Sequence, residues 1–235
     1  MQRGMTLNGK HSFVDFGLRW LEPVEISEPV PKTKKVDIPG RKTPLDATES
    51  LYGSVTYENR TIKLHFYKPL DYATWLVLRS KLDNLYSGQM AKLYLDIDPE
   101  FYWLGRCVAV RSTKENPVLA DFEFEFDVEP FKYFENTPSE DWLWDPFNFE
   151  TGIIQNLRNI PVNGSRTVSV TGNDIPVNPT ITATADMTVA IDGNIYNLEA
   201  NVPRKFIDIV IYKNTKNFAF TGTGKVTISF RGESL

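Results

Sequence analysis

Residues 121–129 read DFEFEFDVE, and this strict alternation decides the fold class of the surrounding chain. Three phenylalanines and a valine occupy the even positions, while Asp or Glu occupies every odd position. Successive side chains of a β-strand point to opposite faces. The run therefore predicts a strand with one buried apolar face and one acidic face.

The flanking sequence extends the same pattern to further strands. Residues 57–67 (YENRTIKLHFY) alternate, with apolar side chains at the even positions from 62 onward. Residues 93–97 (LYLDI) alternate as well, a turn follows at 98–99, and an apolar run continues over 101–110. These segments predict a β-hairpin and a further strand that accompany the acidic one.

One helix is predicted between Pro69 and Gly88. The fixed φ of proline suits a first turn, and glycine is a good C-terminal stop. The apolar side chains between them recur at steps of three and four, as expected for one helix face that packs on a core. These residues are Trp75, Leu78, Leu82 and Leu85.

Residues 23–44 contain five prolines, a basic cluster at 32–35 (KTKK) and little periodicity. This composition favours an extended connection between short strands, and Gly40 after Pro39 indicates a turn. Within residues 1 to about 135, the extended segment and exposed strand edges can pair with another copy of the chain.

Residues 136–150 (NTPSEDWLWDPFNFE) interrupt the strand pattern with two prolines and with acidic and aromatic side chains. We place the domain boundary there, with an N-terminal domain at 1–135, a linker at 136–150 and a C-terminal domain at 151–235. Trp142 and Trp144 are candidate anchors between the domains or for a partner, because aromatic anchors dominate interface energetics. The alternative is that both tryptophans pack only within their own chain.

The C-terminal domain is rich in Thr, Val, Ile, Asn and Gly, and its short alternating runs are separated by turn residues such as 192–194 (DGN) and 222–224 (GTG). Seven short strands without a helix predict a β-sandwich. The runs are 167–171, 180–185, 187–191, 195–198, 206–211, 218–221 and 226–230. The predicted fold is mainly β: a sandwich-like N-terminal domain with one α-helix and a hairpin, then a C-terminal β-sandwich.

The net charge of −4 is unevenly distributed along the chain. Residues 69–150 hold 7 basic and 16 acidic side chains, whereas 1–68 hold 11 and 8, and 151–235 hold 8 and 6. The acidic middle segment argues against a surface that grips nucleic acid, for which clustered Lys and Arg are expected. A solvated acidic face of the strands is the alternative explanation of the same charge.

Reactive chemistry is not predicted, and neither is a cofactor. The sequence lacks the motifs of hydrolases, phosphate-binding loops and zinc sites, and Cys107 lies in an apolar run that indicates a buried, inert thiol. His11 and His65 are too few to complete a soft metal site. The acidic turn at 96–100 could bind Ca²⁺ weakly, but it lacks the Gly and terminal Glu of a calcium loop, so a solvated turn is favoured.

Membrane and export signals are not predicted either. No stretch approaches the ~18 uncharged apolar residues of a membrane helix. The first nine residues do not lead into the apolar region of a signal peptide. We expect a protein that stays in the compartment where it is made.

Four segments together resemble the distal tail protein family of long-tailed phages (siphoviruses). In that family an NGxxSxxxFGL opening is followed by a proline-rich passage, a strand with Asn-Arg, one helix, a hairpin and a strand that ends in Pro-x-Lys-Tyr. The order of these elements is the same here. The segments are TLNGKHSFVDFGLRWLE (Thr6–Glu22), YENRTIKLHF (Tyr57–Phe66), EFEFDVEPFKY (Glu123–Tyr133) and VTISFRGESL (Val226–Leu235).

The resemblance implies a structural protein of the virion, not an enzyme. It implies a hexameric ring made by the N-terminal domain, with rings paired back to back in isolation, and a galectin-like C-terminal sandwich that points outward. Such a ring joins the tail tube protein to the tail-associated hub protein and to the receptor-binding and baseplate proteins. It implies synthesis in the bacterial host cytoplasm and residence in the tail tip or baseplate. The chain has no room for the inserted arm or carbohydrate-binding module of larger members.

DNA must pass through such a ring, and carboxylates on the wall would repel its phosphates without specific binding. We therefore expect part of the acidic middle segment to line the channel. The candidate residues are Asp96, Asp98, Glu100, Asp121, Glu123, Glu125 and Asp127.

The alternative from another functional class is a lectin-like protein that binds carbohydrate through its C-terminal sandwich. Sugar sites usually present an exposed aromatic platform beside polar residues. Residues 151–235 contain neither Trp nor His, which disfavours this alternative.

Overall fold

The computed structural model describes residues 3–48, 50, 55–115, 117–135, 155–172 and 175–235. The chain divides into two compact units, Met1–Lys132 with Leu235, and Tyr133–Ser234, and each unit has its own buried hydrophobic cluster. The fold is mainly β, as predicted. The expected linker 136–150, with Trp142 and Trp144, lies outside the described residues, so its role stays a prediction.

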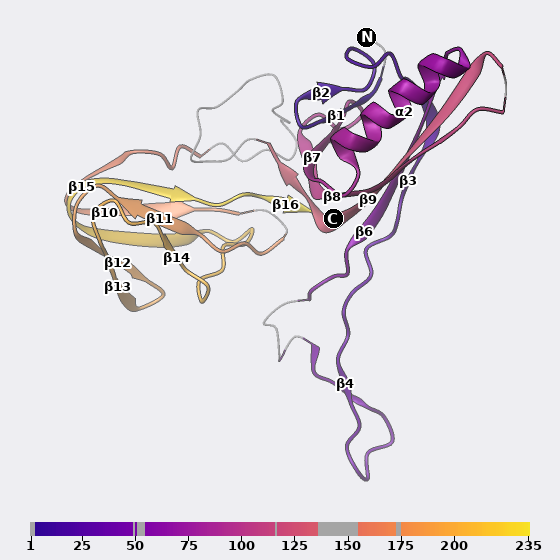
Figure 1. The fold of residues 1–235 in the computed structure, drawn as a ribbon. Helices are drawn as coiled ribbons and strands as arrows, with labels where there is room; N and C mark the ends of the chain where they lie inside the picture. Colours follow the sequence, from indigo (N-terminus) through magenta and orange to yellow (C-terminus); the bar gives the residue numbers. More distant parts are fainter. Residues whose placement is uncertain (1–2, 49, 51–54, 116, 136–154, 173–174) are drawn as a thin grey trace. The chain divides into compact units, whose positions relative to one another are not determined.

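The first unit is a curved antiparallel sheet with helix α2 (Tyr72–Tyr86) across one face (Figure 1). The strands follow the order β2-β1-β7-β8-β9-β6-β3. Their bounds are β1 (Met5–Leu7), β2 (Lys10–His11), β3 (Arg19–Ile26), β6 (Arg60–Pro69), β7 (Met90–Leu95), β8 (Phe101–Thr113) and β9 (Leu119–Phe134).

The alternation of residues 121–129 is confirmed in β9. Phe122, Phe124 and Phe126 are buried, and the intervening carboxylates lie on the other face, partly or fully exposed. Along β6 the pairs in register are Phe66 with Phe122 and Leu64 with Phe124. These matched apolar rows form the centre of the first core, and each buried phenylalanine stabilises the sheet by about 1.5–3 kcal/mol relative to an exposed side chain.

Helix α2 begins at the N-cap Asp71, whose side chain accepts a hydrogen bond from the Thr74 backbone N–H at 2.8 Å. Trp75 and Leu82 are buried, as predicted, but the prediction for Leu85 was wrong. Tyr86 fills the last core position, four residues after Leu82, with its ring edge against Phe16 and Phe124. Leu85 is exposed.

The hairpin prediction needs a similar correction at Ile97, which is exposed because β7 ends at Leu95 and the turn has already begun. The side-chain period of a strand does not extend into a turn. Cys107 on β8 is buried, as predicted. In the described ranges, no helix is long and apolar enough to cross a bilayer.

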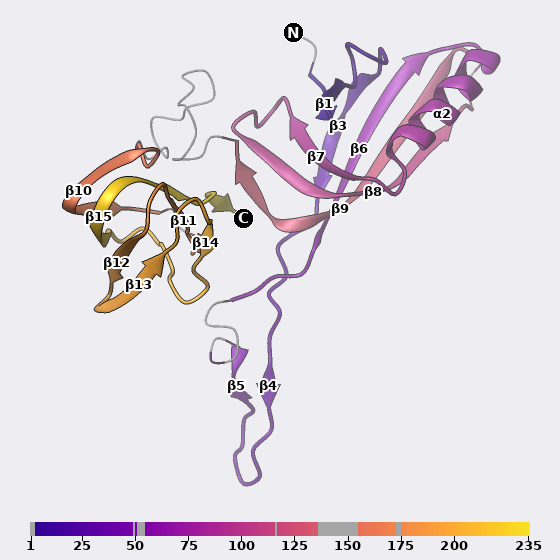
Figure 2. The same cartoon turned by 60° about the vertical axis from the view of Figure 1, so that its left-hand side comes forward.

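The proline-rich segment forms a projecting hairpin, which we define as residues 27–48 and 55–59. It contains β4 (Lys35–Val36) and β5 (Leu45–Asp46), and it extends away from the sheet in both views (Figures 1 and 2). Gly40 has φ +84°, a left-handed conformation that favours glycine, near the tip. The predicted extended connection and turn are confirmed.

The second unit is a sheet ordered β13-β12-β15-β11-β14, with β10 paired to the long strand β15. The turn predicted at 192–194 is confirmed, because Asp192 and Gly193 both have positive φ between β12 and β13. The bounds are β10 (Ile160–Val170), β11 (Thr180–Ala183), β12 (Met187–Ile191), β13 (Asn194–Leu198), β14 (Arg204–Lys205) and β15 (Lys216–Ser229), and the short strand β16 (Glu233–Ser234) is not part of this sheet.

Two sequence predictions fail in this unit. The runs 218–221 and 226–230 belong to the single strand β15, so 222–224 is not a hairpin turn. A Cβ on Gly222 would lie 2.6 Å from the Cβ of Met187, so this glycine permits close packing inside a strand. Residues 206–211 form a loop with one isolated bridge at Ile211, although Phe206 and Ile211 are buried.

Candidate assembly surfaces

Strand β9 presents its carboxylates on the sheet face opposite the phenylalanine core. The four candidate channel residues on this strand therefore share one face, because they occupy alternate positions. They are Asp121, Glu123, Glu125 and Asp127, and their partners in register on β6 are Tyr67, His65, Lys63 and Thr61.

Arg111 on β8 compensates two of these charges. Its guanidinium contacts Glu123 at 2.6 Å and Glu125 at 2.7 Å. The hydrogen bond to Glu123, with the charge of Glu125, raises the pKa of Arg111. Asp121 and Asp127 have no cation within ion-pair distance among the described residues, so Arg111 leaves their charges uncompensated.

The acidic turn after β7 is a second, separate group. Asp96 accepts a hydrogen bond from Nε2 of His11 at 3.0 Å, because Nδ1 of His11 already accepts two backbone N–H groups and Nε2 carries the hydrogen. Asp98 pairs with the ammonium of Lys132 at 2.7 Å. Glu100 has no cation within ion-pair distance in the described part of the chain.

The structure does not bring the two acidic groups together. Lys132, which holds Asp98, is five residues beyond Asp127 along β9, or about 16 Å at the rise of a strand. Asp96 and Asp98 each have a partner, so their contribution to any channel field is reduced. The channel assignment of all seven residues stays a proposal.

The projecting hairpin is fixed at its base. Nε of Arg60 donates to the carbonyl of Ser27 at 2.8 Å, and the guanidinium lies 4.9 Å from the ring centroid of Trp103. The ring of Tyr57 packs edge-on against Phe131 at 5.7 Å. Arg60 is buried, and burial lowers its pKa. The hairpin thus leaves the sheet in a defined direction.

Beyond its base the hairpin is exposed and basic. Lys32 pairs with Glu58 at 3.6 Å. The four remaining cations have no carboxylate within ion-pair distance among the described residues. These are Lys34, Lys35, Arg41 and Lys42.

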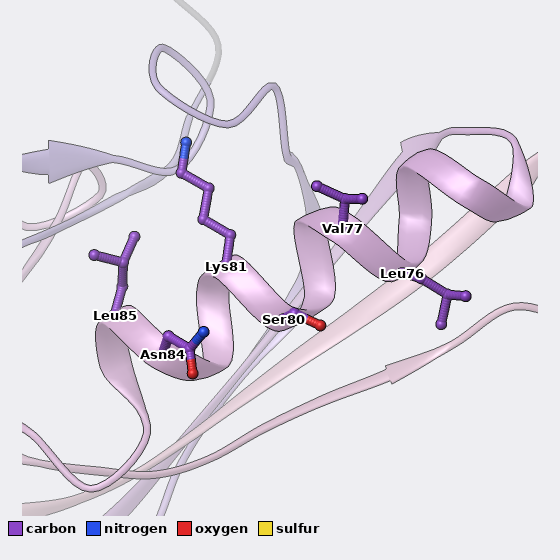
Figure 3. A pocket seen from close by; sticks show the side chains of 6 residues that line it. All are labelled: Leu76, Val77, Ser80, Lys81, Asn84 and Leu85. Atoms are coloured by element: carbon purple, nitrogen blue, oxygen red, sulfur yellow. The ribbon is translucent and has the colours of Figure 1, made fainter.

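The outer face of α2 carries a shallow groove of about 660 Å³ that the sequence analysis did not anticipate. Figure 3 shows two rows of side chains along the helix: Val77, Lys81 and Leu85 in one row, and Leu76, Ser80 and Asn84 in the other. A signal was present in the sequence. Residues 75–78 (WLVL) are four consecutive apolar positions, more than one buried stripe can use.

In the second unit, Tyr196 is an aromatic residue to consider as a sugar platform. Its ring packs edge-on against Phe206 at 5.1 Å, and the guanidinium of Arg204 lies 5.4 Å from its centroid. Its hydroxyl donates to Asp208 at 2.9 Å, which raises its pKa. Because a ring edge, a cation and a carboxylate already engage it, Tyr196 is poorly suited to stacking on a hexose.

The side chains that could react or bind a metal, Cys107 and the histidines among them, also have structural surroundings. Burial raises the pKa of the Cys107 thiol to about 12, so the thiolate that a nucleophile requires is scarce at neutral pH. Among the described residues, no three His, Cys, Asp or Glu side chains converge as a metal site would require. His65 faces Glu25 at 3.8 Å on the open face of the sheet.

No family model matches the sequence, and no curated protein matches it. Among solved structures, the chain is similar to the Dit (gp 19.1) protein of SPP1, presented as a paradigm of the hub adsorption apparatus in phages that infect Gram-positive bacteria. The identity is 15% and the TM-score 0.57, and the match covers 100% of both chains. The two proteins share a fold along their whole length, which confirms the resemblance at the level of fold.

Proposed function

We propose that this chain is a structural hub protein at the distal end of a phage tail and that it acts as a ring, most simply a hexamer. The observation that carries this proposal is the shared fold with a phage hub protein over the full length of both chains. A structural role also agrees with the burial of the Cys107 thiol, which raises its pKa, and with the lack of a converging metal site in the described residues.

In the proposed hub, the ring joins the tail tube protein to a tail-associated hub protein, and the second unit contacts receptor-binding or baseplate proteins. The protein is made in the host cytoplasm and resides in the virion. Trp142 and Trp144 are the proposed anchors between the units or for a partner. This division of labour follows the predicted domains 1–135 and 151–235.

The open face of β9 is the proposed wall of the DNA channel. On this face, Asp121 and Asp127 are the carboxylates that Arg111 leaves uncompensated, and Glu100 belongs to the proposal as part of the separate acidic turn. Asp96, Asp98, Glu123 and Glu125 belong to the same proposal, although each has a cationic or histidine partner. A carboxylate wall lets DNA pass without adhering, because like charges repel.

Mass photometry of the purified full chain tests the assembly. We expect a species of six times 26.9 kDa, or twice that mass if two rings pair back to back. A chain that stays monomeric at high concentration and with its hub partner would contradict the hub role.

The second unit separates this function from the lectin-like alternative. We expect no binding to a glycan array and, from the structural proteins of the phage, recovery of a baseplate component by the full chain. Millimolar or tighter binding to a defined sugar would favour the lectin alternative instead.

A further inference from the structure

Residues 10–18 form a loop at the edge of the first sheet, which we call the N-terminal loop. It begins with the edge strand β2 and ends before β3. Inside it, the backbone N–H groups of Asp15 and Gly17 donate to the carbonyls four residues earlier, at 3.0 and 2.8 Å. The loop is built around the imidazole of His11, which has no role in the proposed hub.

Both ring nitrogens of His11 are engaged. Nδ1 accepts the backbone N–H groups of Phe13 and Val14 at 3.2 and 3.1 Å, and Nε2 donates to Asp96 at 3.0 Å. A neutral imidazole has one acceptor nitrogen and one donor nitrogen, whereas the imidazolium has two donors. The closed loop therefore fits only the neutral imidazole that carries its hydrogen on Nε2.

The imidazole has little room to turn. A Cβ on Gly4 would lie 2.7 Å from Nε2 of His11 and 2.6 Å from Oγ of Ser12, so both side chains pack directly on the backbone of that glycine. Ser12 is buried, and its Oγ accepts the backbone N–H of Met5 at 3.0 Å. Rotation of the ring would break this packing, so a proton on Nδ1 would meet the two backbone N–H groups for as long as the loop stays closed.

The loop also holds part of the first core. Phe16 is buried, and its ring lies edge-on against Tyr86 at 6.0 Å. Its carbonyl accepts a hydrogen bond from the ammonium of Lys68, and the ammonium of Lys81 lies 5.5 Å from its ring centroid. Opening of the loop therefore affects the packing at the last turn of α2 as well as the loop itself.

The carboxyl groups around His11 respond to acid differently from its ring. Asp15 accepts the backbone N–H of His11 at 2.7 Å, and Asp96 accepts the hydrogen of Nε2. Protonation of either carboxyl group leaves an oxygen that still accepts, whereas protonation of Nδ1 replaces the acceptor by a donor. Two ion pairs lie on the flanking segments: Lys10 with Asp15 at 3.6 Å, and Arg3, beside Gly4 in the chain, with Glu22 at 3.2 Å.

We propose that proton uptake at Nδ1 of His11 opens the N-terminal loop, so that this edge of the first sheet responds to acid. The protonated ring turns a donor toward the N–H groups of Phe13 and Val14, which lose their shared acceptor. Because opening takes up a proton, the closed loop is favoured at high pH, and each pH unit across the titration of His11 lowers its closed-to-open ratio by up to about tenfold. Histidine is the side chain whose charge changes between about pH 5 and 8, which sets the range to examine. The proposal concerns a single chain and does not depend on the ring.

Hydrogen–deuterium exchange of the full chain tests this opening. The peptide over residues 10–18 is followed by mass spectrometry at about pH 8 and about pH 5, the limits of the histidine range, with rates corrected for the pH dependence of intrinsic amide exchange. We expect its protection to fall on the order of 10-fold or more at the lower pH. The peptide over residues 122–126 of β9, which lies between β8 and β6, is the internal control and should keep its protection. Equal protection of the loop at both pH values would overturn the proposal.

Two variants separate the acceptor at Nδ1 from the donor at Nε2. His11→Asn supplies an amide oxygen that accepts from backbone N–H groups two and three residues on, as in an Asx-turn, and it does not titrate. Its loop should stay protected at the lower pH. His11→Gln carries an amide that reaches Asp96 but has no acceptor at the position of Nδ1. Its loop should exchange at the higher pH as fast as that of the wild type at the lower pH.

Asp15→Asn and Asp96→Asn are the matched controls, since each keeps an oxygen acceptor and removes a titrating carboxyl group. Both should respond to pH as the wild type does, and loss of the response in either would assign it to that carboxyl group and overturn the proposal. A pH response that persists in His11→Asn, or a protected loop in His11→Gln at the higher pH, would overturn it too. Thermal melting shows whether each variant is folded, and where His11→Gln is not, the wild type and His11→Asn decide the question.

Discussion

Two hairpins of this chain have similar apolar residues and differ in what lies beneath them. The β12–β13 hairpin pairs over five positions and buries Val189 and Ile191 in the second core. The projecting hairpin pairs β4 with β5 over two positions and leaves Val36 and Leu45 exposed. An apolar stripe on a hairpin therefore becomes core only where a second layer covers it, and elsewhere it is free to bind a partner.

The largest expected effect contrasts one isoleucine from each hairpin. Ile191→Ala should lower the free energy of unfolding by about 2–5 kcal/mol, because it leaves a cavity in a packed core. Ile38→Ala should change it by less than about 0.5 kcal/mol in the monomer, because no layer covers that side chain. Urea unfolding of the full chain measures both free energies. Equal losses of stability in the two variants would contradict the difference between the two hairpins.

A smaller effect is expected at the two turn glycines. Gly193 and Gly40 have φ of +82° and +84°, and a Cβ would meet nothing within 4 Å at either. Gly193→Ala should cost about 1–2 kcal/mol through backbone strain alone, since its hairpin unfolds with a core. Gly40→Ala should leave the midpoint of thermal unfolding unchanged. A shift of several degrees for Gly40→Ala would show that the projecting hairpin is coupled to the fold.

The base of the projecting hairpin should respond more locally. Arg60→Lys removes the Nε donor to Ser27 and the planar contact with Trp103, and Lys does not reproduce either. We expect roughly tenfold faster hydrogen exchange at Ser27 and Thr61, about 1.4 kcal/mol of local opening. Arg79→Lys, on the exposed side of α2, is the control and should leave this exchange unchanged.

The smallest effect on stability concerns the thiol of Cys107. Burial raises its pKa to about 12, so the neutral thiol is favoured in the folded state. The stability that the neutral thiol contributes to the fold is fully present below the pKa of the thiol in the unfolded chain, about 8.5. This stability is lost as the pH rises toward the pKa of the thiol in the folded chain. At pH 8 the folded chain should react with a thiol reagent only after denaturant is added, whereas Val36→Cys should react at once. Immediate labelling of native Cys107 would contradict its burial.

The sequence predicts the elements whose apolar side chains recur at a regular spacing. It does not predict features that depend on how side chains pack against other elements. The strict alternation of 121–129 made β9 predictable, because a register error would expose three phenylalanines at once. Leu85 and Tyr86 were not distinguishable by spacing, since residues three and four after Leu82 share its face. Tyr86 is the buried residue of the two, because its ring contacts Phe124 of the sheet.

The candidate surfaces were predicted only in part. The shared face of Asp121 to Asp127 follows from alternation, but the ion pairs of Arg111 depend on a neighbouring strand. The stripe on the projecting hairpin was hidden because only the pairing of Val36 with Leu45 places them on one side. Gly222 and Gly224 resembled turn residues in the sequence. Close packing inside a strand also requires glycine, so glycine alone does not distinguish the two cases.

An electron cryo-microscopy reconstruction of the purified full chain tests the central claim most directly. We predict a six-fold ring with a central opening lined by the open face of β9, so that Asp121 and Asp127 face the lumen. A monodisperse monomer at every concentration, alone and with the hub partner, would contradict the ring. A ring whose opening is lined by basic or neutral side chains would contradict the proposed channel.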